Sequence, residues 1–306
     1  FANVGTSNDA VVASTDLNSS FNTMGIRGIA LKRASDSTAQ AFGLTANNKL
    51  LNFALNNPNT VAEKTLTGLL VDERFIGIVS RLRTTTDHAG KLYGLTNKAN
   101  LYTINTSSGV TSLVTTLKAA AGSSFTALDG TSFAVDFNPT ADRLRVISNT
   151  GQNLRINVDT GDTFKDGDIN GASGAKVTAA AYTNSFKTPV ATLATELFDL
   201  DQTNKTLTKQ TPPNNGTLSL MGSLGINLGT DNGFDIAGGD NGLALATVSG
   251  DSGPSVLYRI DLNIDTTITT PRSRLAITVD NTPNLAASTI GNNTTPQVID
   301  LAILFK

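Results

Sequence analysis

The chain has 306 residues, of which 16% are charged, with a net charge of −2, one histidine and no cysteine. The missing cysteines exclude disulfides, thiolate metal sites and a cysteine nucleophile. The near-neutral charge argues against binding to nucleic acid or an anionic membrane. No stretch approaches the roughly 18 consecutive apolar residues of a membrane span, so we expect no membrane span.

A hairpin pattern is clearest at Leu92–Gly109, LYGLTNKANLYTINTSSG. The apolar run Leu92–Leu95 is followed by a polar turn, and a second apolar run, Leu101–Ile104, ends at another turn. Short apolar runs separated by Asn-, Ser- and Gly-rich turns are typical of β-hairpins. This segment therefore predicts strand, turn, strand, turn.

Related hairpins recur along the chain, each after a small-residue-rich apolar strand. Gly25–Lys32 is the first such strand, and Ala41–Leu55 repeats the hairpin after it. Later units open with Phe75–Arg81, Phe133–Pro139, Val177–Thr183, Gly233–Gly239 and Val298–Phe305. The spacing of these openings falls within the roughly 40–65 residues of a four-stranded propeller blade with its loops.

We therefore predict an all-β protein, a β-propeller-like ring of about six, alternatively five, antiparallel blades that forms a single domain over residues 1–306. Pairing of the terminal segments, residues 1–25 and 295–306, is expected to close the ring. Val298–Phe305 is apolar on both alternating faces, so it needs burial on both. Either it becomes the innermost strand of its own ring, or it is added to the open sheet edge of another subunit.

Three further strings connect the chain to a known family. They are FAVDFNPTADRLRVISNTGQNLRINVDTG at Phe133–Gly161, AAYTN at Ala180–Asn184 and PPNNGTL at Pro212–Leu218. They resemble a bacterial family catalogued as domain of unknown function 4394, and Leu92–Gly109 resembles its recurring blade segment. The resemblance covers roughly Phe42–Ile260. It implies an exported protein with propeller-like repeats, and it transfers no catalytic residues because the family carries no established activity.

His88 is the lone histidine and the obvious candidate for a catalytic base. It lies in the loop-like TTTDHAG, and the sequence contains no nucleophile elbow, which a Ser-His-Asp hydrolase of the α/β type would need. We interpret it as a structural or solvated histidine. No catalytic residue is assigned.

The best metal candidate is the segment that contains Asp166, Asp168 and Asn170. Alternating oxygen side chains followed by glycine match the first half of a calcium-binding loop, but Val177 stands where the closing glutamate is expected. Tight turns use the same residues. We therefore expect no cofactor, with Ca²⁺ at these three residues as the alternative.

Arg143, Arg145 and Arg155 bracket the most family-like hairpin. Alternate residues of a strand share a face, so Arg143 and Arg145 could present a pair to an anion. The alternative, which we favour, is that they pair with Asp136, Asp142 or Asp159 and hold blades together. A separate set of aspartates is scattered among expected turns, where nothing identifies an acid/base pair: Asp201, Asp231, Asp235 and Asp240.

Two classes of function remain open. The first is a non-catalytic exported bacterial propeller that acts as a structural or assembly unit, self-associating as an oligomer or as a filament joined through a terminal strand. The second is a propeller that binds or hydrolyses a small ligand, such as a sugar or lactone, at its central channel. The lone histidine and the missing cysteine and tryptophan favour the first class. Phe1 at the first position suggests removal of a signal peptide, so we expect an extracellular or cell-surface location.

Overall fold

The computed structural model describes residues 39–82, 90–186, 190–237, 242–249, 253–263 and 269–305. These residues all belong to one compact unit, which spans residues 37–306. The prediction that residues 1–306 form a single domain stays a prediction, because residues 1–25 lie outside the described part of the chain.

The hairpin at Leu92–Gly109 forms as its pattern predicts. Strand β5 (Lys91–Thr96) turns back through residues 97–99 into β6 (Asn100–Ile104). Leu92 lies opposite Ile104 and Leu95 lies opposite Leu101, all of them buried. Such cross-strand apolar pairs stabilise an antiparallel ladder. Local alternation and turn chemistry are therefore sufficient to specify this unit.

The described residues form five antiparallel blades, numbered here in chain order from the hairpin β1–β2. Blade 1 contains β23 (Val298–Phe305), β1 (Ala39–Thr45), β2 (Lys49–Ala54) and β3 (Asn57–Thr65). Blade 2 contains β4 (Phe75–Arg81), β5, β6 and β7 (Thr111–Thr116). Blade 3 contains β9 (Phe133–Asn138), β10 (Arg143–Ser148), β11 (Asn153–Ile156) and β12 (Asp162–Lys165), with the short β8 (Lys118–Ala119) at its outer edge.

The remaining two blades have the same four-stranded order. Blade 4 contains β13 (Val177–Tyr182), β14 (Leu197–Asp201), β15 (Thr206–Gln210) and β16 (Leu218–Ser223). Blade 5 contains β17 (Asn232–Ile236), β18 (Ala244–Val248), β19 (Val256–Ile260) and β20 (Ser273–Leu275). Smaller elements are the 3₁₀ turn η3 (Pro213–Asn215), the ribbon of β21 (Thr278–Val279) and β22 (Thr282–Pro283), and α1 (Leu285–Ser288). No helix among the described residues has the length and apolar composition needed to cross a membrane.

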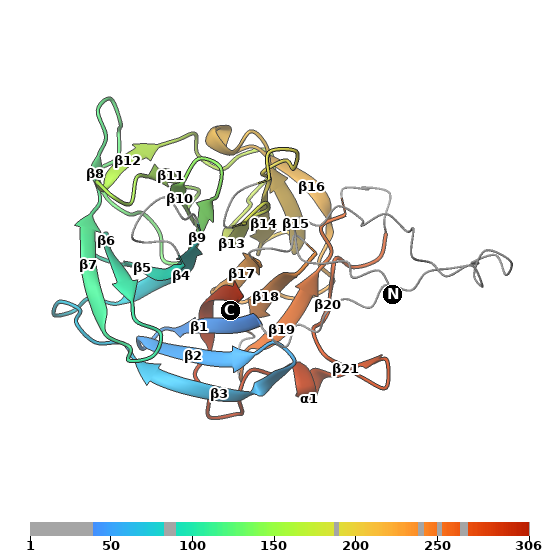
Figure 1. Ribbon diagram of the computed structural model, residues 1–306. Coiled ribbons are helices and arrows are strands. Elements are labelled where there is room, and N and C mark those ends of the chain that lie inside the picture. The colour runs from blue at the N-terminus through green and yellow to red at the C-terminus, as the bar shows by residue number, and fades with distance from the viewer. Residues whose placement is uncertain are drawn as a thin grey trace, which may run out of the picture. The chain divides into compact units, whose positions relative to one another are not determined.

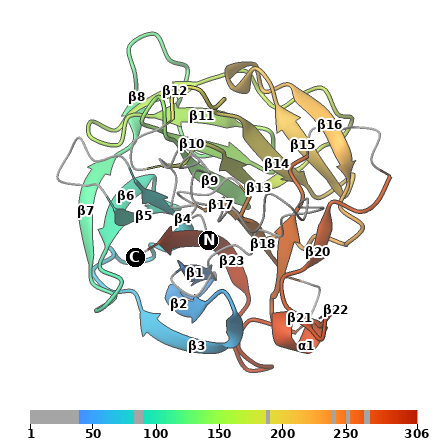
Figure 2. The ribbon, with the colours of Figure 1, turned by 45° about the vertical axis from the view of Figure 1, so that its right-hand side comes forward.

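The inner strands β4, β9, β13, β17 and β23 stand around the centre of the ring (Figures 1 and 2). Each contacts the next, and β17 contacts β23, so the ring is closed. The closing strand β23 pairs antiparallel with β1, with Leu301 opposite Gly43. The C-terminal strand is thus innermost in its own ring, which is the intramolecular alternative expected from the sequence. Its partner is β1, and the expected pairing with residues 1–25 stays a prediction because those residues lie outside the described part of the chain.

The ring has five blades, the smaller of the two predicted numbers. Two apolar strands, Gly25–Lys32 and Val298–Phe305, were both expected to open a blade. Blade 1 has one strand on the inner side of β1, and that strand is Val298–Phe305. Gly25–Lys32 lies outside the described residues.

The core lies between the blades. Five apolar clusters of described residues fill the five spaces between neighbouring blades. Between blades 2 and 3, for example, the rings of Tyr93 and Phe137 meet edge to face with centroids 5.7 Å apart. Both faces of each blade are therefore buried, which explains the nearly continuous apolar inner strands.

Three turns between the third and fourth strands of a blade approach the chain leaving the preceding blade. Each has a glycine in the left-handed region, where glycine alone is unstrained. An added Cβ at these glycines would lie 2.2–2.5 Å from a backbone oxygen of the preceding blade. The contacts are Gly109 with Thr65, Gly161 with Thr116 and Gly216 with Asp168. These glycines end the strings SSG, DTG and NNG that mark the family resemblance.

Candidate functional site at the ring centre

Three aspartates on inner strands tie the ring together. Each carboxylate accepts a hydrogen bond from a backbone amide of the neighbouring inner strand. The pairs are Asp136 with Tyr182, Asp235 with Ile303, and Asp300 with Ile78, at 2.5, 2.5 and 2.7 Å. Buried backbone amides need a partner, and inner strands of different blades share no ladder. The aspartates therefore join blade 3 to 4, blade 5 to 1 and blade 1 to 2.

The centre between these strands is closely packed. A side chain at Gly77 of β4 would lie 2.4 Å from Val135 and 3.1 Å from the Asp300 carboxylate. A side chain at Gly233 of β17 would lie 2.4 Å from the backbone nitrogen of Leu301. Strand β9 also contacts β17 directly, although blade 4 lies between them in the ring. Small residues at the centre are thus required by the close approach of five strands.

Burial raises the pKa of all three aspartates. The pKa of Asp235 rises to about 7, and those of Asp136 and Asp300 rise well above the usual range. The charge of Asp235 acts in the same direction on both of the others. Because desolvation disfavours the charged form, these carboxyls favour the neutral state, in which they still accept hydrogen bonds. Their geometry suits them to joining strands.

A smaller polar group lies where three inner strands begin. Arg74, Ser132 and Asp231 immediately precede β4, β9 and β17. Burial raises the pKa of Asp231, while hydrogen bonds from Thr230 and Ser132 and the charge of Arg74 act in the opposite direction. Asp231 is half-buried and Arg74 is exposed. Solutes can therefore reach Arg74 and part of Asp231, whereas Ser132 is buried.

Arg145 is the centre of a buried network between blades 3 and 4. Its guanidinium donates to Asn153 and to Asp166, both at 2.8 Å, and to Asn214 of η3 at 2.7 Å. Its Nε donates to the hydroxyl of Tyr182 at 3.2 Å. With 3% of its surface exposed, Arg145 is fully engaged. The prediction that these arginines hold blades together is therefore supported by its contacts with blade 4.

The other arginines and their expected partners are arranged differently from the prediction. Asp142 and Asp159 both bind Arg81 of blade 2, at 2.7 and 2.8 Å. Arg155 pairs with Asp166 at 3.1 Å, and Arg143 donates to backbone carbonyls of its own turn. Asp136 is occupied by the inner-strand contact. Ion pairs do join neighbouring blades. However, Asp142 and Asp159 of blade 3 pair with Arg81 of blade 2 and not with the arginines of their own blade.

One carboxylate in the same interface has no hydrogen-bond partner among the residues that the structure describes. Both oxygens of Asp199 in β14 are buried without a hydrogen bond, and so is Oε1 of Gln210 in β15. Burial raises the pKa of Asp199 well above its usual range, and the charge of Arg145 acts in the opposite direction. A buried unsatisfied acceptor costs stability, so Asp199 is a destabilising element of the interface.

The calcium candidates each have a separate partner. The Asp166 carboxylate binds Arg145 and Arg155. Asp168 lies 3.3 Å from the Lys165 ammonium, and Oδ1 of Asn170 accepts from the Thr217 hydroxyl at 3.0 Å. The described residues contain no group of three or more His, Cys, Asp or Glu placed to hold a metal ion. Calcium binding here stays a prediction.

His88 and Asp240 lie outside the described residues, so their roles stay predictions. Asp201 and Asp235 were expected in turns, and this was wrong: they lie within β14 and β17. The sequence contains a signal for the inner aspartates, because Asp136, Asp235 and Asp300 share one position. Each stands between two apolar residues in an opening strand, as VDF, FDI and IDL. An isolated polar residue at a repeated position of a buried strand indicates a specific partner.

The chain belongs to the family described as a domain of unknown function (DUF4394), which it matches over residues 49–280. The match extends from β2 to the residues after β21, and so includes most of the ring. The resemblance stated from the sequence is confirmed. Comparison with curated proteins gives no match.

Solved structures show only distant similarity. A protein of unknown function from Bacteroides thetaiotaomicron is 15% identical over 90% of this chain and 67% of its own, with a TM-score of 0.44. Virginiamycin B lyase from Staphylococcus aureus is 14% identical over 71% of this chain and 65% of its own, with a TM-score of 0.35. A putative 6-phosphogluconolactonase from Bacteroides uniformis is 11% identical over 88% of this chain and 100% of its own, with a TM-score of 0.39. Such similarities carry no conclusion about activity.

Proposed function

We propose that this protein is a non-catalytic β-propeller that acts as a structural or assembly unit on or outside the bacterial cell. The observation that carries the proposal is the use of Asp136, Asp235 and Asp300, whose carboxylates each accept a backbone amide of the neighbouring inner strand. A catalytic acid/base pair needs carboxylates that reach a substrate proton, whereas these join blades at a closely packed centre.

Assembly would use the outer surface of the ring, because β23 already completes its own blade. The outer strands β7 and β16 each carry a leucine on their exposed side, Leu113 with 56% and Leu220 with 63% of its surface exposed. An exposed strand at the edge of a sheet favours contact with another sheet edge. A second copy of the chain would supply a matching edge.

The proposal is tested on the full chain purified from its host. Sedimentation over a wide concentration range, with electron microscopy of the same samples, should reveal multi-copy assemblies. Leu220→Ser should weaken them, whereas Thr140→Ser, a conservative change on an exposed turn, should not. Exposed protein on intact cells, measured by protease shaving, tests the location. A monomer at every concentration, found only inside the cell, would contradict the proposal.

The alternative, binding or hydrolysis of a small sugar or lactone, is favoured by one feature, the rim group of Arg74, Ser132 and Asp231. A panel of lactones and esters assayed with the full chain separates the two functions. We expect no turnover above the uncatalysed rate. Turnover that disappears in Asp231→Asn or His88→Ala would establish the alternative.

A further inference from the structure

Asp199 of β14 is a carboxyl buried in the interface between blades 3 and 4, with none of its surface exposed. Its register partner Ala180, and Leu197 two positions earlier on the same face, belong to the apolar cluster that fills this interface. Neither oxygen of Asp199 accepts a hydrogen bond from the described residues. A carboxylate contains only acceptors, so an ionised Asp199 would be a buried charge without a donor.

A second unsatisfied acceptor lies on the same face of blade 4. Gln210 of β15 is 1% exposed, and its Nε2 donates to the carbonyl of Pro213 at 2.6 Å. Its Oε1 accepts no hydrogen bond from the described part of the chain. Asp199 lies opposite Thr208, two positions from Gln210, so Asp199 and Gln210 are diagonal neighbours on one face. Diagonal neighbours are roughly 7–8 Å apart, which long side chains can span.

The charges around Asp199 are already engaged. Titratable side chains on the surrounding strands are Asp136 of β9, Arg145 of β10, Tyr182 of β13, Asp201 of β14 and Lys209 of β15. The charge of Arg145 favours ionisation of Asp199, and that of Asp201 opposes it. Arg145 binds the Asp166 carboxylate at 2.8 Å, and Lys209 pairs with Glu196 on the opposite face of blade 4. An ionised Asp199 would therefore compete with Asp166 for one guanidinium.

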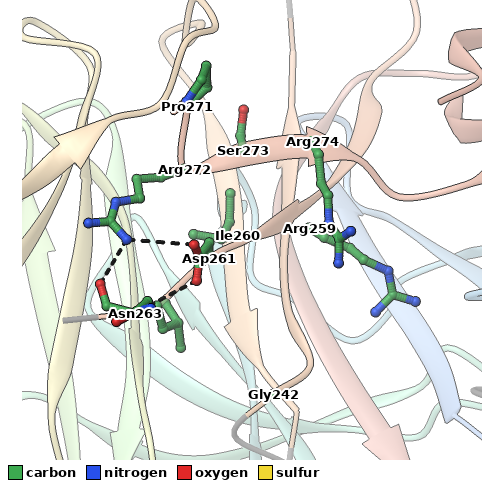
Figure 3. Close-up of a pocket in the computed structure, with 10 residues that line it drawn as sticks. Gly242, Arg259, Ile260, Asp261, Asn263, Pro271, Arg272, Ser273 and Arg274 are labelled. Carbon is green, nitrogen blue, oxygen red and sulfur yellow. Dashed lines mark hydrogen bonds and ion pairs between the residues drawn. The ribbon is translucent and has the colours of Figure 1, made fainter. Parts of the chain in front are cut away.

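The interface between blades 4 and 5 differs because solvent lies near its charges. Arg272 donates to a carbonyl of blade 4 at 2.7 Å and lies 3.6 Å from Asp261, in the wall of a pocket of about 490 Å³ (Figure 3). The Asp261 side chain is 54% exposed. Arg259 and Arg274, opposed in the ladder of β19 and β20, line the same pocket. Water can stabilise charges there, whereas Asp199 has no contact with solvent.

We propose that Asp199 is a neutral carboxylic acid whose hydroxyl donates a hydrogen bond to Oε1 of Gln210, so that a bound proton joins two buried side chains where blades 3 and 4 meet. A protonated carboxyl gains one donor, which satisfies the Gln210 oxygen and removes the buried charge. Burial raises the pKa of Asp199 well above its usual range, as this state requires. The other oxygen of Asp199 stays unpaired, so the proton reduces the cost of burial without removing it. This proton site is independent of the proposed assembly function.

Infrared spectroscopy of the full chain at neutral pH tests the protonation directly, because a protonated carboxyl has a carbonyl stretch that a carboxylate lacks. Asp199→Asn should remove one such band. Asp201→Asn is the matched control, since the Asp201 carboxylate accepts from the amides of Lys176 and Thr203, and it should remove none. Gln210→Met should move the Asp199 band to higher frequency, because a hydrogen bond lowers that frequency. A spectrum unchanged by Asp199→Asn, or an Asp199 band unmoved by Gln210→Met, would overturn the proposal.

Urea denaturation of the same proteins tests the pH dependence. An aspartate in an unfolded chain has a pKa of about 3.9. The stability that the Asp199 proton supplies is therefore fully present below about pH 4 and is lost as the pH rises. Asp199→Asn keeps a neutral donor, so its urea midpoint should rise relative to that of the unchanged protein between about pH 4 and 9. A constant difference over this range would contradict a proton bound at Asp199.

The contact between the two side chains is tested by a double-mutant cycle near pH 5. Gln210→Met also loses the bond to Pro213, so it is compared in two backgrounds. It should lower the urea midpoint more in the unchanged protein than in Asp199→Leu, where the donor for Oε1 is already gone. Equal losses in the two backgrounds would show that Asp199 does not donate to Gln210.

Discussion

The carboxylate of Asp300 accepts a 2.7 Å hydrogen bond from the backbone amide of Ile78, a residue 222 positions earlier in the chain. The other oxygen of Asp300 accepts from the amide of Leu301 at 2.8 Å. Asp300 thus joins the closing strand β23 to blade 2 as well as shaping its own strand. The bond connects the blade that contains the closing strand to the blade that follows it in the ring.

Removal of this acceptor should weaken the ring. Asp300→Ala leaves the buried amide of Ile78 without a partner, so we expect a loss of about 1–3 kcal/mol in the free energy of unfolding. Asp300→Asn keeps an oxygen acceptor without a charge and should cost less. Urea denaturation of both variants measures the difference. Equal loss in the two would show that the hydrogen bond is not the source of the effect.

The stability of the ring should fall as the pH rises through the weakly acidic range. Burial raises the pKa of Asp235 to about 7, compared with about 3.9 in an unfolded chain. The folded state therefore holds the proton of Asp235 more tightly than the unfolded chain does. The contribution of Asp235 to the free energy of unfolding is fully present below about pH 4. That contribution is lost as the pH rises through about 7. Unfolding followed from pH 4 to 8 measures this trend, and Asp235→Asn should flatten it.

The glycines between blades provide a matched pair of substitutions. Gly122 and Gly161 have nearly the same backbone angle, φ of 77° and 78°. An added Cβ at Gly122 meets nothing within 4 Å, whereas at Gly161 it lies 2.2 Å from the carbonyl oxygen of Thr116. Gly122→Ala should cost about 1–2 kcal/mol from the left-handed backbone. Gly161→Ala should cost more than about 3 kcal/mol, because strand β7 must also move. Similar losses would contradict the close approach.

Calcium should have little effect on the fold. The Asp166 carboxylate already binds two arginines and its side chain is 8% exposed. A ligand that binds only the folded state raises its melting temperature, so melting curves with excess Ca²⁺ and with excess chelator provide the test. We expect the two curves to coincide. A saturable rise with Ca²⁺, lost in Asp168→Ala, would establish a calcium site.

Asp199→Asn should stabilise the protein, or leave it unchanged, at neutral pH and above. Both oxygens of Asp199 are buried without a hydrogen bond from the described part of the chain. The substitution therefore replaces a carboxyl whose charged form is disfavoured by burial with a neutral amide. The neighbouring Asp201→Asn is the control. The Asp201 carboxylate accepts from the backbone amides of Lys176 and Thr203, and its substitution should cost stability. Chemical denaturation at pH 8 compares the two. A clear loss in Asp199→Asn would indicate an unseen partner.

The blades were predictable from the sequence because their signals are local. In Leu92–Ile104, alternation and a polar turn suffice, and β5 and β6 form where they were expected. The apolar character of Val298–Phe305 on both faces correctly predicted an innermost strand. The number of blades was ambiguous because Gly25–Lys32 has the same character. The pairing of Gly43 with Leu301 decides it, and no local pattern contains that pairing.

The polar contacts were predictable only in part. Asp136, Asp235 and Asp300 occupy one repeated position, but their partners are backbone amides of other blades, which leave no trace in the sequence. The other two inner strands, β4 and β13, have apolar residues where these strands have the aspartate. The opposition of Arg259 and Arg274 likewise depends on the register of the short edge strand β20, which no local pattern fixes.

The position of β23 also determines when the ring can be completed. Because β23 is synthesised after every other strand, blades 2 to 5 can form while β1 still has an open edge. Contacts between residues so distant in the sequence form slowly, and an open edge invites aggregation in that interval. The completed ring has a corresponding point of weakness. A protease that removed only the final strand would open the ring, although it would leave the other blades uncut.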